Sequence, residues 1–402
     1  MYFMGIDWAT DKHDVCLLDT AGTILKQVTC SQSLAGFQQL ERLVLRYGAE
    51  NIRINIERSD GLLVDWIMNQ GWALHVTPTM VVARRRPRRS KSDLSDAYLL
   101  AHLLRLEDPD CRLLRRSSKI VLQLRETVRA LDNALEEQRR LGNRLRYILM
   151  QYYPVALKLF TRVEHLISLA FLENFPTPEA ARKLTPTTLK RFFKEHRYRY
   201  PSRIPAILEL LQTPMPRATA PEGYVAQLKV LVPVLRQLFY GIHQLEKDIA
   251  ALFNTHPEAE WWRSLPGAHG PLTSARLLAW IGDERTRFPT AETLQAVAGT
   301  APVTRRSGKS LTVEFRRACS GALRNAADDF ARQSVRHSQW AREYRDAQLA
   351  RGHNPARAYR ALANRWMKII WTLWLRHEPY DEAIHAANRA LKGNAATLQR
   401  AG

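Results

Sequence analysis

The sequence contains few cysteines, and those it has are scattered. Cys16, Cys30, Cys111 and Cys319 lie far apart and form no CxxC pair. This spacing argues against a disulfide framework and against a zinc site. We therefore interpret all four as reduced thiols of the core, with Cys319 buried.

Long hydrophobic runs are absent as well. A membrane-spanning helix needs about 20 predominantly apolar residues, and no stretch of the sequence approaches that length. The N-terminal MYFMGIDWATDKHD reaches a charged residue by its seventh position and has no apolar core of signal-peptide length. We expect a cytoplasmic protein that does not associate with a membrane.

Acidic residues are scarce relative to basic ones. The chain has 39 Asp and Glu against 60 Lys and Arg, a formal net charge of +21. Such an excess attracts a polyanion, and nucleic acid is the obvious partner. With 402 residues, 46% of them hydrophobic, the chain is long enough for several folded domains. We expect three, at 1–112, 113–256 and 257–402.

The first domain has the pattern of a mixed α/β sheet. Three short β-type runs, MYFMGIDWA, HDVCLLD and TILKQVTC, are separated by turn signals. A helical stretch near 33–47, the strand NIRINIE, the helix GLLVDWIMNQG and the strand WALHVTP follow. An antiparallel meander followed by right-handed crossovers places the first strand centrally, beside the strand that ends at Glu57. Asp7 and Glu57 should therefore lie together.

Two further carboxylates open the next helix. Asp93 and Asp96 in KSDLSDAYLLA are three residues apart, so that both lie on one helix face. Four carboxylates that converge without basic partners repel one another, and a divalent cation with oxygen ligands relieves this repulsion. Magnesium fits best. A pair of such ions activates and stabilises oxygens during phosphodiester cleavage or exchange.

A simpler interpretation exists for each acid. Asp93 and Asp96 alone are more often helix caps, because carboxylates in the first turn complement the helix dipole. Asp7 is also compatible with a turn, and periodicity leaves Asp11, Asp14 and Asp60 as rival carboxylates.

A basic run, ARRRPRRSK, precedes the acidic helix. Its candidate nucleic-acid contacts are Arg84, Arg85, Arg86, Arg88, Arg89 and Lys91. Such a run is either a solvated loop or a patch that contacts phosphates without reading sequence. Because it adjoins the proposed metal site, we favour phosphate contact.

The middle of the chain has two heptad patterns. One runs from Leu124 to Tyr152 and is broken at Gln138 and Gly142, and the other is uninterrupted over 231–252. We expect the two helices to pair as an antiparallel coiled coil. The basic and aromatic insert at 154–223 suits either RNA or single-stranded DNA binding or an ordinary surface.

The last domain should be mainly helical. The segment WWRSLPGAHGPLTSARLLAWIGD suggests a helix-hairpin-helix element, whose turn amides would hold a DNA phosphate, or a plain helical hairpin. The tail from WAREYRDAQLA onward is helical, with Trp and Leu on the face that covers the core.

The sequences GIDWA, INIE and KSDLSDAYLLA resemble the Asp-Glu-Asp-Asp signature of the RuvC-like (RNase H-like) domain in DEDD-type insertion-sequence transposases. These enzymes are also called bridge-RNA-guided recombinases and are related to Piv-type DNA invertases. The segment from FPTAETLQAVAG to ACSGALRNA resembles their C-terminal domain, and PGAHGPLTSA resembles their hairpin with His269 as an extra residue. The resemblance implies that Asp7, Glu57, Asp93 and Asp96 bind Mg²⁺, with Mn²⁺ as an alternative.

The same resemblance matches Ser307 with the family's catalytic serine. A serine hydroxyl is a weak nucleophile, so a base or a metal must activate it. The flanking cations Arg305, Arg306 and Lys309 would neutralise the attacked phosphate. Ser310 is a nearby competitor for this role.

The resemblance implies a magnesium-assisted DNA transposase or recombinase with a serine nucleophile. Its implied partners are DNA, a structured guide (bridge) RNA and further copies of the chain, as a dimer or tetramer, in the nucleoid of a prokaryotic cell. Two alternatives stay open: a RuvC-type endonuclease that hydrolyses branched DNA, and a non-catalytic basic scaffold that binds nucleic acid with a steep salt dependence.

Overall fold

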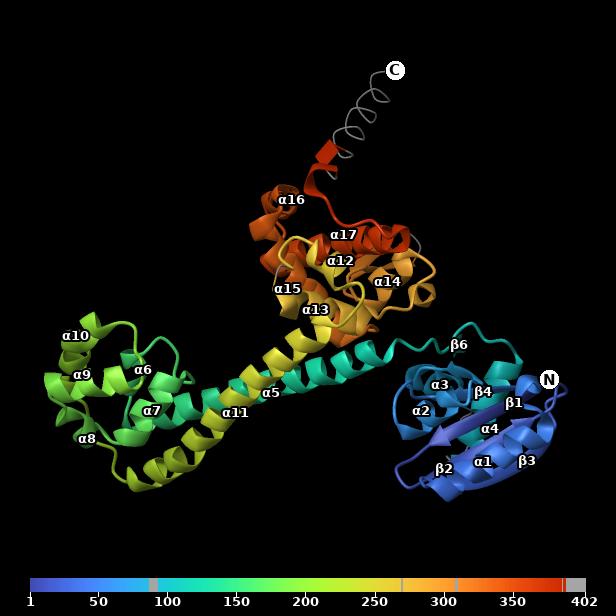
Figure 1. The fold of residues 1–402 in the computed structure, drawn as a ribbon, viewed down its shortest axis with the longest axis horizontal. Coiled ribbons are helices and arrows are strands. Elements are labelled where there is room, and N and C mark those ends of the chain that lie inside the picture. Colours follow the sequence, from blue (N-terminus) through green and yellow to red (C-terminus); the bar gives the residue numbers. More distant parts are fainter. Residues whose placement is uncertain (87–92, 269, 308–309, 385, 388–402) are drawn as a thin grey trace, which may run out of the picture. The chain divides into compact units, whose positions relative to one another are not determined.

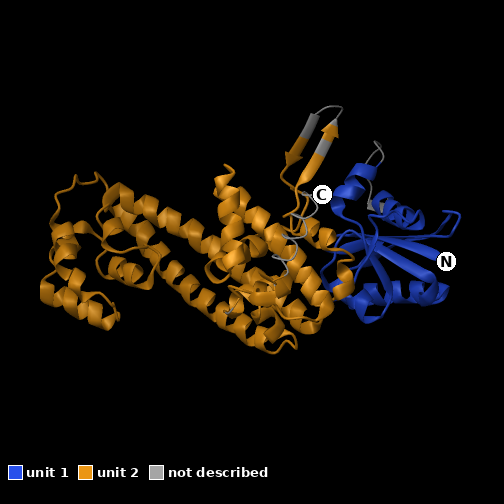
Figure 2. Cartoon of the chain, turned by 90° about the horizontal axis from the view of Figure 1, so that it is seen from above, with its two compact units in different colours: residues 1–116 blue, residues 117–402 orange. Residues whose placement is uncertain are grey.

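The computed structural model describes residues 1–86, 93–268, 270–307, 310–384 and 386–387 (Figure 1). The chain forms two compact units, Met1–Arg116 and Ser117–Gly402 (Figure 2).

The first unit is built on a six-stranded sheet with the order β3-β2-β1-β4-β5-β6. The first three strands pair antiparallel, and β4 and β5 continue parallel to β1. The strands are β1 Tyr2–Trp8, β2 Lys12–Leu18, β3 Ile24–Ser31, β4 Ile52–Ile56, β5 Ala73–Val76 and β6 Arg112–Leu113. The expected meander and the central first strand are confirmed. The short β6 strand, antiparallel to β5, was not predicted.

Helices cover both faces of this sheet. They are α1 Leu34–Tyr47, α2 Leu62–Asn69, α3 Thr79–Arg85 and α4 Asp93–Arg105. One face buries Met4 and Ile6 together with Phe37 of α1 and Ile67 of α2. The opposite face packs against α4 through small residues such as Ala97. The mixed α/β class is confirmed, while the RuvC-like assignment remains a prediction.

The second unit is mainly helical. Its long helices are α5 Lys119–Tyr152 and α11 Glu222–Asn254, with α6 Ala156–Leu159, α7 Leu166–Asn174, α8 Pro178–Arg182, α9 Pro186–Glu195 and α10 Ile204–Gln212 between them. The C-terminal part contains α12 Ala259–Arg263, α13 Pro271–Ile281, α14 Ala291–Val297, α15 Gly321–His337, α16 Gln339–Ala350 and α17 Pro355–Arg376.

The two long helices lie side by side and run in opposite directions (Figure 1). The first half of α5, including Leu124, shares a core with Ile249 near the end of α11. The second half, including Leu149, shares another core with Leu228 near the start of α11. The predicted antiparallel pairing is therefore observed, and its coiled-coil character stays a prediction.

By length and composition alone, α11 would be able to cross a membrane. Its buried residues Val232, Leu235, Ile242 and Ile249 belong to the cores shared with α5 and its neighbours. Of its most apolar 18-residue window 28% is buried, and Val230 and Val234 are exposed, so these cores account for one face of α11.

The C-terminal part packs around tryptophans. Trp262, Trp366 and Trp374 are fully buried and lie in one cluster with Phe330. A two-stranded antiparallel sheet, β7 Val303–Ser307 and β8 Ser310–Glu314, was not predicted. The helical character of the tail is confirmed as far as α17. The helix-hairpin-helix assignment at α12 and α13 remains a prediction, and His269 lies outside the described residues.

The four cysteines are free thiols. Cys16 and Cys30 are buried as expected, but Cys111 and Cys319 are only partly buried. Cys319 lies beside the Gly299 turn and accepts a hydrogen bond from the Arg324 guanidinium at 3.6 Å. The prediction of a buried Cys319 was therefore wrong in degree.

Candidate metal site and serine hairpin

Asp7 lies near the end of β1 and Glu57 directly follows the neighbouring strand β4, at the same edge of the sheet. Strand β1 pairs in parallel with β4, with Gly5 opposite Asn55 and Ile6 opposite Ile56. Because side chains alternate along a strand, Asp7 shares a face with Gly5, and Glu57 follows Asn55 on that face. The two carboxylates therefore extend one step beyond the last pair in the register, as the strand order predicted.

The face that carries both acids is the one covered by α4. The Asn55 side chain is fully buried and donates a hydrogen bond to the Leu100 carbonyl of α4 at 2.8 Å. Its own oxygen accepts a hydrogen bond from the Thr77 hydroxyl at 3.0 Å. This network fixes α4 against β4, so that the N-terminal end of the helix lies at the edge where Asp7 and Glu57 emerge.

Gly5 allows this close approach. A methyl group at Gly5 would overlap the backbone oxygen of Ala97 and the backbone nitrogen of Ala101, and would lie 2.9 Å from the Leu100 Cβ. Only glycine permits strand and helix to meet here. The sequence signal, a glycine two residues before Asp7, was visible but cannot be assigned to a helix contact without the fold.

We expect Gly5→Ala to destabilise the first unit, because backbone atoms on α4 cannot move aside as a flexible side chain would. Overpacking of this kind typically costs ~1–3 kcal/mol. In urea denaturation of the full chain, the unfolding transition of the first unit should move to a lower urea concentration. Gly241→Ala, on α11 with open space around it, should leave that transition unchanged. Equal behaviour of the two variants would contradict the proposed contact.

Asp96 is the most sequestered of the described acids. It is 2% exposed and lies on the first turn of α4. The Arg86 guanidinium binds it with two hydrogen bonds, from Nε to Oδ1 at 2.8 Å and from Nη2 to Oδ2. Such a forked contact is the strongest form of an ion pair.

The negative charges of Asp7 and Glu57 also act on the Arg86 guanidinium. The hydrogen bond to Asp96 raises the pKa of Arg86, burial opposes it, and the charges of Asp96, Glu57 and Asp7 raise it further. The acids therefore gather at one corner of the sheet, and Arg86 is the cation they face.

The donor set has the right chemistry for a hard divalent cation, since all its ligands are carboxylate oxygens. Among the residues described by the structure, however, no three His, Cys, Asp or Glu side chains are placed to hold a metal as they stand. Asp93 begins α4, and its side chain lies outside the described set. In the described arrangement Arg86 occupies the carboxylate of Asp96.

The three rival carboxylates have other surroundings. Asp14 is buried and accepts a hydrogen bond from the Thr29 hydroxyl. Asp60 pairs with Arg58 at 3.3 Å on the surface, and Asp11 is exposed. Asp14 lies opposite Asp7 in the β1–β2 pair, so it is the rival with the best position.

The three described arginines of the basic run have different partners. Arg84 is exposed and donates to the Met80 carbonyl, while Arg85 pairs with Asp108 at 2.9 Å. Arg86 pairs with Asp96 instead of lying open to phosphate. The remaining candidates, Arg88, Arg89 and Lys91, lie outside the described residues.

Ser307 is the last residue of β7. It pairs with Ser310, the first residue of β8, across the turn of the hairpin. Arg306 is exposed. The side chains of Arg305, Ser307 and Ser310 are not among those described, nor is Lys309. The backbone thus puts both candidate serines at the tip of a hairpin that stands away from the helices of the second unit (Figure 2).

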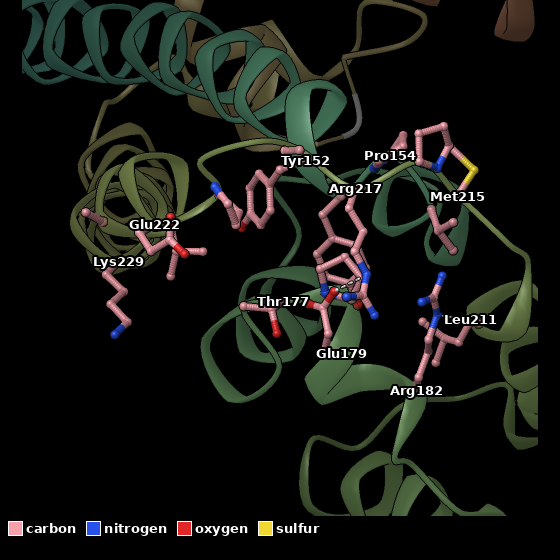
Figure 3. A pocket seen from close by; sticks show the side chains of 18 residues that line it. Tyr152, Pro154, Thr177, Glu179, Arg182, Leu211, Met215, Arg217, Glu222 and Lys229 are labelled. Carbon is pink, nitrogen blue, oxygen red and sulfur yellow. Dashed lines mark hydrogen bonds and ion pairs between the residues drawn. The ribbon is translucent and has the colours of Figure 1, made fainter.

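A cavity of about 600 Å³ lies in the insert, between the end of α5, α8 and the start of α11 (Figure 3). Its arginines are engaged within the protein. Arg182 donates to the carbonyls of Leu211 and Thr213, both at 3.3 Å, and Arg217 faces Glu179 at 4.0 Å. Of the two interpretations left open for the insert, nucleic-acid binding and an ordinary surface, this cavity adds no support to the first.

Comparison with known proteins relates the whole chain to transposases. Residues 4–154 match the family model DEDD_Tnp_IS110, described as "Transposase", and residues 260–346 match "Transposase IS116/IS110/IS902 family". The chain is 31% identical over 398 residues to the "Mini-circle putative transposase for IS117" of Streptomyces coelicolor, covering 94% of this chain and 95% of that protein. The chain belongs to the IS116/IS110/IS902 family of transposases. The resemblance to DEDD-type insertion-sequence transposases is thereby confirmed.

Two proteins named after insertion elements also align with most of the chain. The uncharacterized 43.6 kDa protein of insertion element IS110 from Streptomyces coelicolor is 26% identical over 382 residues, covering 92% of this chain and 93% of that protein. The uncharacterized 42 kDa protein of insertion element IS900 from Mycobacterium paratuberculosis is 26% identical over 356 residues, covering 82% and 87%. The first family match contains the acidic corner, and the second contains the serine hairpin.

Proposed function

We propose that this transposase excises and inserts a mobile element by covalent strand exchange, with Ser307 as the nucleophile and the acidic corner as its metal site. One observation carries the proposal. Asp7, Glu57 and Asp96, from two strands and a helix, gather about one cation in a chain of the transposase family. A scaffold whose acids were only helix caps would have no reason to place them together.

The chemistry would begin with Ser307. Its hydroxyl oxygen attacks a DNA phosphorus and gives up its proton, and the bond from phosphorus to a deoxyribose oxygen breaks. The released oxygen takes up a proton, and a phosphoserine ester is formed. Attack by a strand hydroxyl on that ester restores the serine and joins the new ends. One ester replaces another, so no external energy source is needed.

The acids Asp7, Glu57, Asp93 and Asp96 would hold Mg²⁺, with Mn²⁺ as an alternative. Bound there, the metal would stabilise charge on the phosphorus and favour ionisation of a nearby hydroxyl. Arg86 would have to release Asp96 when the metal binds. The exposed Arg306 and its neighbours Arg305 and Lys309 would neutralise the attacked phosphate.

The proposal includes the partners implied by the family. A structured non-coding RNA would pair with donor and target DNA, and two or four copies of the chain would form the assembly, with acids and serine meeting within or between copies. Action in the bacterial nucleoid suits the charge of +21.

The full chain, purified from its native host, should carry RNA that sequencing identifies. Incubated with DNA flanking the element and with magnesium, it should give rejoined products, and chelation should lower their yield at least ~100-fold, because the metal site would be empty. Free ends without rejoining would favour hydrolysis of branched DNA. Binding with no change in the DNA would favour the scaffold.

A further inference from the structure

The base of the serine hairpin opens into a strongly basic cavity of about 560 Å³. Its walls come from the turn before β7, the end of β8, and helices α14, α16 and α17. Its charged lining residues are five cations and one carboxylate, namely Arg316, Arg357, Arg360, Arg365, Lys368 and Glu314. The cavity lining therefore has a clear excess of positive charge.

Helix α17 supplies most of this charge. The lining positions 357, 360, 361, 364, 365 and 368 recur every three or four residues, which places them on one helix face. The opposite face of α17, including Trp366 and Ile370, is buried in the core. At about 1.5 Å per residue the basic stripe runs for ~16 Å along the helix.

The floor of the cavity is fixed, and its rim is open to a ligand. The Thr300 hydroxyl donates to the Asn364 side chain at 3.0 Å, and the Arg360 guanidinium lies over the Phe315 ring at 4.3 Å. Arg357 and Arg365 are exposed, and in the described part of the chain neither is paired with a carboxylate. In the insert cavity, by comparison, Arg182 donates to two backbone carbonyls and the exposed Arg217 faces Glu179.

We infer that this cavity binds the phosphodiester backbone of the DNA strand that the transposase cuts, with Arg357 and Arg365 as the phosphate contacts. The length of the basic face favours a strand, which presents successive phosphates, over a small anion. The position of these contacts along the DNA strand rests on the proposed function, because it is counted from the phosphate that Ser307 attacks.

The length of β7 sets the distance between the cavity and Ser307. Pro302 lines the cavity and Ser307 ends β7, so five residues of extended chain separate them. At ~3.3 Å per residue this is ~17 Å, or about five base-pair steps at ~3.4 Å each along the axis of a DNA duplex. The contacted phosphates should therefore lie about five nucleotides from the attacked one.

The test uses the full chain with Ser307→Ala, so that binding is measured without chemistry, and a labelled 40-base-pair duplex that spans the element end. Adding Arg357→Ala and Arg365→Ala should weaken binding at least tenfold and lower the slope of log K against log salt by about 2, since two phosphate contacts are lost. Arg376→Ala, exposed at the other end of α17, is the matched control and should change neither.

A second test replaces one phosphate at a time along the strand by a neutral methylphosphonate. The replacement should weaken DNA binding when it lies about five nucleotides from the cleavage site, and at that position it should not weaken binding by the double variant any further. The inference would be overturned if the double variant bound the DNA duplex with unchanged affinity, or if Arg376→Ala lost as much DNA affinity as the double variant. It would also be overturned if the double variant lost affinity only for an RNA duplex of the same sequence. If Ser307 forms no adduct but the double variant still loses DNA affinity, the proposed nucleophile fails and the cavity stands.

Discussion

Replacement of Ser307 by alanine is expected to eliminate the covalent protein–DNA adduct of this transposase. The change removes one hydroxyl from the end of β7 and leaves the strand pairing intact. Without the oxygen nucleophile no phosphoserine ester forms, so adduct yield should fall at least ~100-fold, within the range seen when a nucleophile is removed. The measurement is the fraction of end-labelled DNA that migrates with the protein after denaturation.

Ser310 provides the matched control. It pairs with Ser307 across the hairpin, so Ser310→Ala makes the same chemical change one strand away. It should keep the adduct at near normal yield. Loss of the adduct in Ser310→Ala alone would make Ser310 the nucleophile. DNA cut to free ends by Ser307→Ala, at the normal rate, would show that water attacks and that the serine mechanism is wrong.

The hairpin itself could have been predicted from its sequence. VTRRS and SLTVE are rich in β-branched residues and flank a short turn that contains glycine, which is a hairpin signal. The resemblance drew attention to Ser307, and the local strand pattern went unassigned. In the first unit the same kind of reasoning succeeded, because strands β1 to β5 alternate with clear turns and amphipathic helices.

The contacts of the acidic corner could not be predicted in the same way. The strand order predicted that Asp7 and Glu57 would lie together, but a run of arginines has no periodicity that says which one turns inward. Arg86 contacts Asp96 because α3 ends and α4 begins beside the same sheet edge. Asn55 was missed for a related reason, since a polar residue in a buried strand is explained only by its α4 partner.

The ion pair at this corner makes two substitutions act in opposite directions on metal affinity. A divalent cation that binds Asp96 must displace a guanidinium held by two hydrogen bonds. Hydrogen bonds to charged groups contribute ~1.5–3 kcal/mol, and each 1.4 kcal/mol is a factor of ten in affinity. Removal of the guanidinium should therefore strengthen metal binding, whereas removal of the carboxylate charge should weaken it.

Titration calorimetry of the full chain with Mg²⁺ should show affinity raised about tenfold or more in Arg86→Gln and lowered at least tenfold in Asp96→Asn. Arg84→Gln is the matched control, because Arg84 lies two residues away and, in the described part of the chain, donates to the Met80 carbonyl and pairs with no carboxylate. It should leave the affinity unchanged. Weaker binding in both Arg86→Gln and Asp96→Asn would mean that the pair supports the fold and does not compete with the metal.

Thermal stability gives a second measurement of the same competition. Asp96 is 2% exposed, so Arg86→Gln leaves a buried carboxylate without its cation, a change that costs up to ~3–5 kcal/mol when both partners are buried. Arg86 is about one third exposed, which reduces this penalty. Without metal, Arg86→Gln should melt at a lower temperature than the natural protein. Saturating Mg²⁺ should raise the melting temperature of the variant by more than it raises that of the natural protein, because a ligand bound only to the folded state stabilises it more when its affinity is higher. Failure of Mg²⁺ to narrow the gap would place the metal elsewhere in the chain.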